Sequence, residues 1–267
     1  MQTTIVYMVA GLSSRFGGKI KQFAKVGPQN QTLIEYSIEQ AMQAGFQDIV
    51  FIVGEKTKIP FQEMFGDSYK GCQVRYAMQT FDPQTRDKPW GTVDALVCAK
   101  KLLTNPFVIC NGDDIYGEKA LKCAHDAITL GEDVIVGYYL GDVMPSVGSV
   151  NRGIIREKNG LVVDIQENYN ISIENLSEKN LTEKSVASMN LFGFQPKTME
   201  LFAQQLASFK KENPSRTAEC LLPVELGKLI QENKISVKLE KTHDQWFGVT
   251  NPEDEQIVRE LIAKNRK

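Results

Sequence analysis

The first 140 residues alternate between short apolar runs and segments with helical spacing, and this alternation limits the choice of fold more than any other feature. The runs TIVYMV (4–9), DIVFIV (48–53) and PFVIC (106–110) are short and rich in β-branched residues, which is typical of buried strands. Between them, residues 32–44 and 91–103 carry apolar side chains at helical spacing. The alternation predicts a Rossmann-like α/β fold, in which a mostly parallel mixed sheet has helices on both faces.

After residue 140 the alternation gives way to shorter strands and turns. The runs 153–156 and 161–165 are predicted to be strands joined at Asn159-Gly160, a dipeptide typical of tight turns. Residues 173–184 are polar and mixed in charge, so we expect an excursion on the surface. Beyond them the periodicity predicts strands at 187–194 and 235–239 and helices around 199–209, 218–231 and 252–264.

Length, composition and charge limit the class of protein. With 267 residues, 42% of them hydrophobic and 24% charged, the chain suits one large globular domain, which we place at 1–267. A net charge of −2 argues against nucleic acid as a partner. No apolar run approaches the ~20 residues that span a bilayer. The N-terminus lacks the positive region of a signal peptide, so we expect a cytoplasmic protein without a membrane partner.

The five cysteines and two histidines form no cluster along the sequence. The cysteines are scattered, most of them inside apolar segments, and none belongs to a CxxC pair. We therefore predict buried free thiols in a reducing compartment. His125 and His243 have no neighbour in the sequence that would complete a triad or a metal site.

The loop after the first predicted strand, VAGLSSRFGGKIKQ at 9–22, has the composition of a phosphate-binding site. Its small residues let backbone N–H groups approach a ligand, and clustered N–H groups bind anions. Arg15 adds a planar fork of donors, and Lys19 and Lys21 add mobile charges. Two common phosphate motifs are absent, because no hydroxyl residue follows Lys19 as in a P-loop and Ser13 interrupts a GxGxxG pattern.

Two further polar segments, 79–91 and 111–114 (NGDD), also follow predicted strands. Ligands of open parallel sheets bind beyond the carboxyl ends of the strands, so we expect these segments and the first loop to meet in one crevice. There, Asp113 and Asp114 could hold a divalent cation that bridges phosphate oxygens. The alternative is a turn with an N-cap for the helix predicted after Gly117. The cationic loop opposite favours the metal site.

Taken in order, these segments resemble the motifs of sugar-1-phosphate nucleotidyltransferases, the superfamily of glucose-1-phosphate thymidylyltransferases and uridylyltransferases. The first loop resembles the [LV]-x-A-G-x-[GS]-[ST]-R-[FM]…K signature, and Asn111-Gly112-Asp113 resembles the metal motif. ASMNLFGF at 187–194 is similar to a stretch on the sugar side, and WFGVTNPE at 246–253 to the closing element. The order of the motifs, across nearly the whole chain, makes the resemblance specific.

The resemblance implies a nucleotide-diphospho-sugar transferase fold, with a nucleotide-binding half at 1–140 and a sugar-phosphate-binding half at 141–267. It also implies that a sugar-1-phosphate attacks the α-phosphate of a nucleoside triphosphate in line, with Mg²⁺ as cofactor and release of pyrophosphate. The implied catalytic residues are Arg15, Lys21 and Asp113. Arg15 would clamp the β- and γ-phosphates, Lys21 would bridge the reacting phosphates, and Asp113 would hold the metal.

The resemblance assigns binding residues as well. Gln79 would read the base, and because a glutamine can pair with the uracil or thymine edge, UTP or dTTP is favoured. The sugar phosphate would be held by Gly153, Glu167 and Asn190. The nucleotide would be held by Ala10, Gly11, Leu12, Ser13, Ser14, Gln79, Trp90, Gly91 and Thr92.

The closing element departs from the family pattern at Gly248. The family usually offers the metal a second carboxylate at this position. We assign the role to Asn251, as in N-acetylglucosamine-1-phosphate uridylyltransferases, whose Gly-Val-Asn-Asn resembles residues 248–251. Thr250 is an alternative, and Asp254 is a weaker one.

A second departure is Asn168, where many members carry a lysine or arginine that contacts the sugar phosphate. Lys197 or Arg152 would be the substitute, unless the acceptor is unusual or the activity weak. Two alternatives therefore stay open: a cytidylyltransferase acting on a non-sugar phosphate, and a catalytically weak paralogue that binds nucleotide in a regulatory role. The identity of the sugar and the formation of a homo-oligomer are open too.

Overall fold

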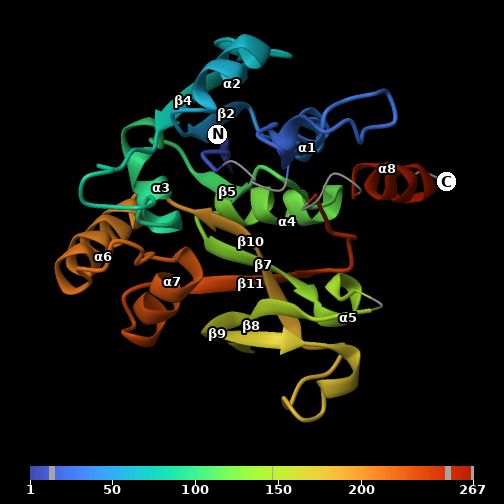
Figure 1. The fold of residues 1–267 in the computed structure, drawn as a ribbon. Helices are drawn as coiled ribbons and strands as arrows, with labels where there is room; N and C mark the ends of the chain where they lie inside the picture. The colour runs from blue at the N-terminus through green and yellow to red at the C-terminus, as the bar shows by residue number, and fades with distance from the viewer. Residues whose placement is uncertain (12–15, 146, 250–253, 266–267) are drawn as a thin grey trace.

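One mixed sheet runs through the molecule (Figure 1). The structure is a computed structural model that describes residues 1–11, 16–145, 147–249 and 254–265. The strands of the sheet are β1 (Thr4–Met8), β2 (Asp48–Val53), β3 (Ser68–Tyr69), β4 (Cys72–Met78), β5 (Phe107–Asn111), β7 (Asp133–Tyr139), β8 (Val150–Lys158), β9 (Leu161–Ile171), β10 (Val186–Phe194) and β11 (Val237–Thr242). Their order is β3-β4-β2-β1-β5-β10-β7-β11-β9-β8. Two short strands, β6 (Asp114–Ile115) and β12 (Phe247–Gly248), pair outside this sheet.

The central strands are parallel, as the alternation predicts. β4, β2, β1 and β5 are parallel neighbours, and β7 and β11 form another parallel pair. β10 runs antiparallel between β5 and β7, so β7 and β11 point the same way as the first four strands. All six residues of β2 are buried, as expected for a strand covered on both faces. The carboxyl ends of these strands therefore share one edge of the sheet.

Helices cover both faces of the sheet, as predicted (Figure 1). Apolar side chains of α1 (Leu33–Ala44), α2 (Lys58–Phe65) and α4 (Glu118–Thr129) pack on one face, and those of α3 (Thr92–Cys98), α6 (Thr198–Glu212) and α7 (Leu222–Gln231) on the other. α8 (Asp254–Asn265) packs beside α1, and a short helix, α5 (Leu140–Val143), follows β7. Within the described part of the chain, no helix has the length and apolarity to span a bilayer.

Local signals in the sequence explain where several elements begin and end. Thr32 and Glu35 form a capping box at the start of α1, and Gly45 ends it with φ of 113°. Asn159 and Gly160 adopt φ of 54° and 78° between β8 and β9, which confirms the predicted tight turn. The helix predicted at 91–103 is wrong in its second half, because α3 ends at Cys98 and a 3₁₀ turn leads into β5.

The β8–β9 hairpin and the excursion after it are more extensive and better anchored than predicted. β8 pairs with β10 as well as with β9, and β9 meets β11, so the hairpin folds back over the end of the sheet. The excursion at 173–184 buries Leu176 and Leu181 in the core and is therefore not purely a surface segment. All five cysteines are free, and Cys72, Cys110 and Cys220 are buried as predicted. The prediction is wrong for Cys98, which is exposed, and for Cys123, which is partly exposed.

Candidate functional site

The ends of β1 and β5 lie against each other and bring two predicted catalytic residues together. Gly112 donates its N–H to the carbonyl of Met8 (3.1 Å). A Cβ at position 112 would lie 2.2 Å from Cγ1 of Val9, so only glycine allows this approach. Beside this junction the ammonium of Lys21 forms an ion pair with the carboxylate of Asp113. The pair joins the cationic loop to the end of β5.

The rest of the first loop is only partly described. Ala10 and Gly11 continue from β1 at the same edge of the sheet, Ala10 partly buried and Gly11 exposed. The other predicted ligands of this loop, Leu12, Ser13, Ser14 and Arg15, lie outside the described residues. Their assignments stay predictions.

Asp114 lies in a different environment from Asp113. Its Oδ2 accepts a hydrogen bond from the Asn111 amide (2.8 Å) and lies 3.2 Å from the hydroxyl of Tyr116. Burial, together with the negative charge of Asp113, raises the pKa of Asp114 to about 8. Asp113 therefore pairs with a cation, whereas burial makes its neighbour Asp114 harder to ionise than an exposed aspartate.

The alternative interpretation of Asp113-Asp114 was a turn with an N-cap for the next helix; residues 112–113 do form a turn, but the N-cap is wrong. α4 begins at Glu118, and its free N–H groups at Lys119 and Ala120 are bound by the carboxylate of Asp244 (2.7 and 3.0 Å). Asp114 instead belongs to β6 and faces the interior. Neither Asp113 nor Asp114 therefore caps α4.

The oxygen donors at this point suit Mg²⁺. Within the described residues, no group of three or more His, Cys, Asp or Glu side chains could hold a metal by itself. Magnesium, however, keeps several waters and usually takes only one or two protein carboxylates plus phosphate oxygens. Asp113 at the junction fits that limited role. Asn251 and Thr250, the predicted further ligands, lie outside the described residues.

The structure explains why position 248 lacks a side chain. Strands β12 and β6 pair so that Gly248 stands opposite Asp114. A Cβ at 248 would lie 2.7 Å from the Trp246 ring and 3.0 Å from Oδ1 of Asp114. The Trp246 ring and the Asp114 carboxylate occupy the space that a carboxylate on residue 248 would need.

Gln79, at the end of β4, has its amide orientation set by its partners. Its Nε2 donates to the carbonyl of Gly91 (3.1 Å) and to the carboxylate of Asp94 (3.0 Å). Both partners are acceptors, so the NH₂ end must face them, and Oε1 is left without a partner among the described residues. Lys210 donates to the other oxygen of Asp94 (2.8 Å). Neither Asp94 nor Lys210 was predicted from the sequence; the signal for Asp94 was a charged residue at a buried position of a predicted helix.

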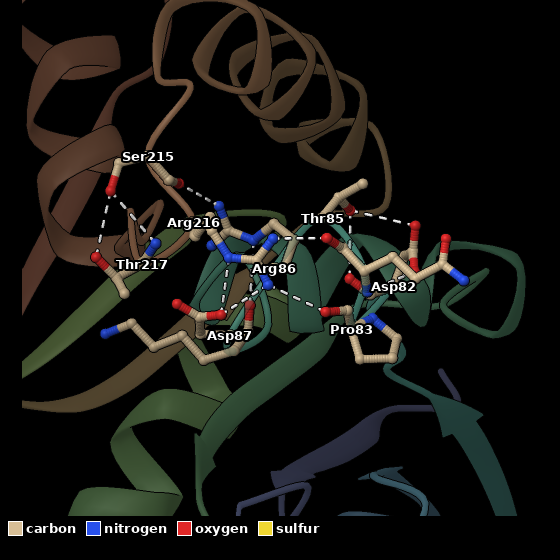
Figure 2. Close-up of polar contacts among 10 residues, drawn as sticks. Asp82, Pro83, Thr85, Arg86, Asp87, Ser215, Arg216 and Thr217 are labelled. Carbon is tan, nitrogen blue, oxygen red and sulfur yellow. Dashed lines mark hydrogen bonds and ion pairs between the residues drawn. The ribbon is translucent and has the colours of Figure 1, made fainter.

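Arg86 and Arg216 connect the loop at 79–90 to the segment before α7 (Figure 2). We call these two residues the arginine clasp. Arg86 is buried, lies 3.5 Å from the centre of the Trp90 ring, and donates to the carbonyls of Ser215 (2.7 Å) and Ala218 (2.5 Å). Arg216 donates in the opposite direction, to the carbonyls of Gln84 (2.6 Å) and Pro83 (3.0 Å), and pairs with Asp87.

Backbone contacts continue this connection past the clasp. The carbonyl of Trp90 accepts from the N–H of Cys220 (2.7 Å), and the hydroxyl of Thr92 accepts from the N–H of Leu222 at the start of α7 (2.7 Å). Trp90 and Thr92, predicted to bind nucleotide, therefore also hold the wall of the site in place. Gly91 contributes through the carbonyl that orients Gln79.

The predicted sugar-side residues line a cavity of about 190 Å³. Gly153 stands opposite Glu167 across the β8–β9 pair, and a Cβ on Gly153 would lie 3.2 Å from the Glu167 carboxylate. Burial raises the pKa of Glu167, although the charge of Arg152 opposes the shift. Asn190 sits at a bulge of β10 with φ of 61°, and its side-chain amide bonds to none of the described residues. The cavity therefore offers polar groups that are open to a ligand.

Of the two proposed substitutes for a cation at position 168, only one reaches this cavity. Arg152 is the direct cross-strand partner of Asn168, and it lines the cavity together with Trp246. Lys197 borders a separate hollow beside Asp133.

Known proteins are similar to this chain over most of its length. The family model described as nucleotidyl transferase matches residues 18–246. The low-salt glycan biosynthesis nucleotidyltransferase Agl11 of Haloferax volcanii is 21% identical over 266 residues, which cover 96% of this chain. The chain spans 66% of the length of that relative.

Solved structures share the fold at low sequence identity. A Bacillus anthracis protein assigned as a glucose-1-phosphate thymidylyltransferase, in complex with sucrose, matches with a TM-score of 0.69 and 16% identity over 97% of this chain and 95% of its own. A UDP-glucose pyrophosphorylase complexed with UDP-glucose matches with a TM-score of 0.68 and 18% sequence identity, and the match covers 100% of both chains. The inositol-1-phosphate CTP transferase from T. maritima matches with a TM-score of 0.69 and 16% sequence identity, and the match covers 100% of this chain and 97% of its own.

Proposed function

Because the chain belongs to the nucleotidyl transferase family, we propose that it transfers a nucleotidyl group from UTP or dTTP to a sugar-1-phosphate, which yields an NDP-sugar and pyrophosphate. The chain is thus a nucleotidyltransferase with the nucleotide-diphospho-sugar transferase fold. The observation that carries the proposed reaction is the Lys21–Asp113 ion pair. It lies at the edge of the sheet where the first loop meets the end of β5. We also propose that the cytoplasm is its compartment, since all five cysteines are free thiols.

The reaction needs neutralisation of charge more than it needs a base. A sugar phosphate is already ionised at neutral pH, so its oxygen can attack the α-phosphate without losing a proton to the enzyme. Lys21 would hold the two reacting phosphates in line and screen their repulsion. Asp113 neutralises the Lys21 ammonium until the substrates bind. Mg²⁺, held by Asp113 with Asn251 as the proposed second ligand, would supply further charge neutralisation at the α-phosphate.

Arg15 and the backbone of residues 10–14 complete the proposed triphosphate site. An arginine fork suits the β- and γ-phosphates, and N–H groups among small residues suit their oxygens.

The orientation of Gln79 supports a uracil or thymine base. Only its Oε1 is free of partners in the described structure, so it can accept but not donate. The N3–H of uracil and thymine is a donor, whereas N3 of cytosine is an acceptor and would repel this oxygen. A cytosine base would have to meet Gln79 through its exocyclic amino group instead. UTP and dTTP therefore suit this arrangement better than CTP.

The cavity lined by Gly153, Glu167 and Asn190 supports a polyhydroxylated acceptor. A carboxylate and an amide that are not bonded to each other are suited to bind sugar hydroxyl groups. The structural likeness to an inositol-1-phosphate CTP transferase keeps a second candidate, cytidylyl transfer to a non-sugar phosphate. The two candidates differ in base and in acceptor, so one assay separates them.

That assay measures pyrophosphate release in the presence of Mg²⁺ for every pairing of UTP, dTTP, CTP, ATP and GTP with glucose 1-phosphate, N-acetylglucosamine 1-phosphate and inositol 1-phosphate. We expect release with UTP or dTTP and a sugar-1-phosphate. Release with CTP and inositol 1-phosphate alone would establish the second candidate. No release from any pairing, with nucleotide binding intact, would contradict both.

A further inference from the structure

The pairing between β5 and β10 ends at Ile109 and Phe192, two residues before the end of β5. Continued to the end of β5, the same register would place Asn111 opposite Asn190. Instead, β10 forms a bulge between Ser188 and Phe192. Asn190 has φ of 61° in this bulge, a conformation that a residue with a side chain keeps only when its surroundings hold it there. The end of β5 and the bulge of β10 therefore need another group to hold them.

The hydroxyl of Tyr116 lies between these two strand segments. It accepts a hydrogen bond from the N–H of Asn111 (3.1 Å) and donates to the carbonyl of Met189 (2.9 Å). The carbonyl of Asn190 is 3.5 Å away. Buried backbone groups are costly to leave unpaired, and here one hydroxyl satisfies a donor on β5 and an acceptor on β10. The hydroxyl thus replaces the direct pairing that the bulge interrupts.

The position of this hydroxyl is set from within the core. Tyr116 is fully buried, and its own carbonyl accepts from the hydroxyl of Tyr138 (2.6 Å), which is fully buried as well. A tyrosine hydroxyl has one hydrogen to donate, and the carbonyl of Met189 is its nearest acceptor. The carboxylate of Asp114 lies farther away (3.2 Å) and accepts from the side-chain amide of Asn111 (2.8 Å).

The two segments that Tyr116 connects carry residues from opposite sides of the candidate site. Asn111 leads into the turn that contains Asp113, whose carboxylate pairs with Lys21. Asn190 lines the acceptor cavity. Two hydrogen bonds of one hydroxyl therefore link the side of the reacting phosphates to the side of the acceptor.

We propose that Tyr116 is a positioning residue, which fixes the bulge at Asn190 relative to the reacting phosphates at Asp113. The proposal rests on the proposed function, because it takes Asn190 to bind the acceptor. In-line attack requires the acceptor's oxygen to be close to the α-phosphate and aligned with it, and a displacement of ~1 Å can cost ~10²-fold in rate. Because Tyr116 is fully buried, it acts through the backbone of Asn111 and Met189.

A purely structural role for Tyr116 makes a different prediction. Removal of its hydroxyl would then lower the melting temperature and leave the kinetic constants for both substrates unchanged. Tyr7 provides a matched control, because it is a fully buried tyrosine of the same hydrophobic cluster and its hydroxyl accepts from Ser37 in α1 (3.3 Å). Tyr7→Phe and Tyr116→Phe make the same chemical change in the same core, but only Tyr116→Phe breaks the link between β5 and β10.

The first measurement is hydrogen–deuterium exchange of the protein without substrates, read by mass spectrometry of peptides that cover 107–116 and 186–194. We expect exchange in both segments to become ~10-fold faster in Tyr116→Phe, because the N–H of Asn111 loses its acceptor and the bulge loses its donor. Tyr7→Phe should exchange as the wild type does in these segments. Circular dichroism and thermal melting establish that each variant is folded. Equal exchange in the two variants would overturn the proposal.

The second measurement is steady-state kinetics with the pairing of nucleotide and acceptor that gives the fastest pyrophosphate release. We expect Tyr116→Phe to raise KM for the acceptor ~10-fold and to lower kcat ~10- to 100-fold, while KM for the nucleotide stays unchanged. Tyr7→Phe should match the wild type in all three constants. An equal rise of both KM values, or wild-type constants in Tyr116→Phe, would overturn the proposal.

The variant Asn190→Gly shows whether Tyr116 acts through the bulge. Glycine adopts φ of 61° without strain and removes the side-chain amide that lines the cavity. Two changes that act through one group are not additive. In the Asn190→Gly background, Tyr116→Phe should therefore change KM for the acceptor by less than ~2-fold. The full ~10-fold effect in that background would contradict a route through Asn190.

Failure of this proposal is distinguishable from failure of the proposed function. If the proposed function fails, the wild type releases no pyrophosphate from any pairing. Exchange is measured without substrates, so faster exchange of both segments in Tyr116→Phe would still support the link between β5 and β10. If instead the positioning role fails, the wild type is active and Tyr116→Phe has wild-type exchange and kinetics.

Discussion

The two sides of the candidate site differ in how their polar groups are satisfied. On the nucleotide side, Gln79 is held by Gly91 and Asp94, and Asp94 is held in turn by Lys210. On the acceptor side, by contrast, buried donors of the cavity have no partner in the described structure. The first side is therefore held in place by its own residues, whereas the second leaves donors for which the described residues provide no acceptor. Substitutions should accordingly change base selectivity on the first side and acceptor affinity on the second.

The largest effect is expected where the two sides meet, at Lys21. Replacing Lys21 by alanine removes the cation that we assign to both reacting phosphates, and losing such a donor typically costs ~10²–10³ in rate. We expect kcat for pyrophosphate release to fall by that factor while the protein stays folded. Lys19→Ala is the matched control, since Lys19 is exposed and two residues away, and it should retain normal turnover. A near-normal kcat in Lys21→Ala would contradict the role that we assign to Lys21 at the reacting phosphates.

The arginine clasp tests how firmly the nucleotide side is held (Figure 2). Arg86→Met leaves two partly buried carbonyls without their donor and loses the contact of the buried guanidinium with Trp90, so we expect a loss of ~1–3 kcal/mol in the free energy of unfolding. Arg216→Met removes an exposed arginine and should cost below ~1 kcal/mol. Urea denaturation measures both. Equal losses in the free energy of unfolding for the two variants would contradict the expectation that the buried Arg86 stabilises the fold more than the exposed Arg216.

Gly248→Ala tests the wall of the acceptor side. The added methyl would lie 2.7 Å from the Trp246 ring, which must move, and such overpacking typically costs ~1–3 kcal/mol. We expect lower stability together with a higher KM for the acceptor and an unchanged KM for the nucleotide. Thermal melting and steady-state kinetics provide the two readings. A rise in KM for the nucleotide instead would place Trp246 on the other side of the reaction.

The smallest effect is expected at Asp94. Asparagine at this position could donate to Gln79, which would let the Gln79 amide turn over and present its NH₂ end to the base. We expect the preference of kcat/KM for UTP or dTTP over CTP to shrink by about tenfold, the equivalent of one hydrogen bond of ~1.4 kcal/mol. Lys210→Met keeps the Asp94 carboxylate, so it should reduce the preference for UTP or dTTP by a smaller factor. A preference that is unchanged in both variants would show that the network does not orient Gln79.

Elements defined by short-range signals were predictable. The capping box at Thr32, the apolar run of β2 and the turn at Asn159-Gly160 each depend on residues a few positions apart, so the sequence shows them directly. Lys21 and Asp113 were predictable as candidates because a phosphate loop and a pair of aspartates both follow predicted strands. Their ion pair follows from the parallel order of β1 and β5.

Other features depend on contacts between distant parts of the chain, and no local pattern predicts them. Arg86 finds its carbonyl partner at Ala218, which is 132 residues away, and Lys210 finds Asp94 across 116. The helix predicted at 91–103 is another case in which the spacing of apolar residues did not show the boundary, since α3 ends at Cys98 and a 3₁₀ turn follows at Lys100–Leu102.

By itself the sequence determined the class of fold, because periodicity acts over a few residues, and it predicted a phosphate-binding role for the first loop. Only the tertiary structure decided which aspartate meets Lys21, which end of the Gln79 amide is free, and that Nε of Arg152 has no acceptor among the described residues. Those properties follow from burial and from partners far along the chain. A side chain's charge, orientation and unmet hydrogen bonds exist only once the strands have set its surroundings.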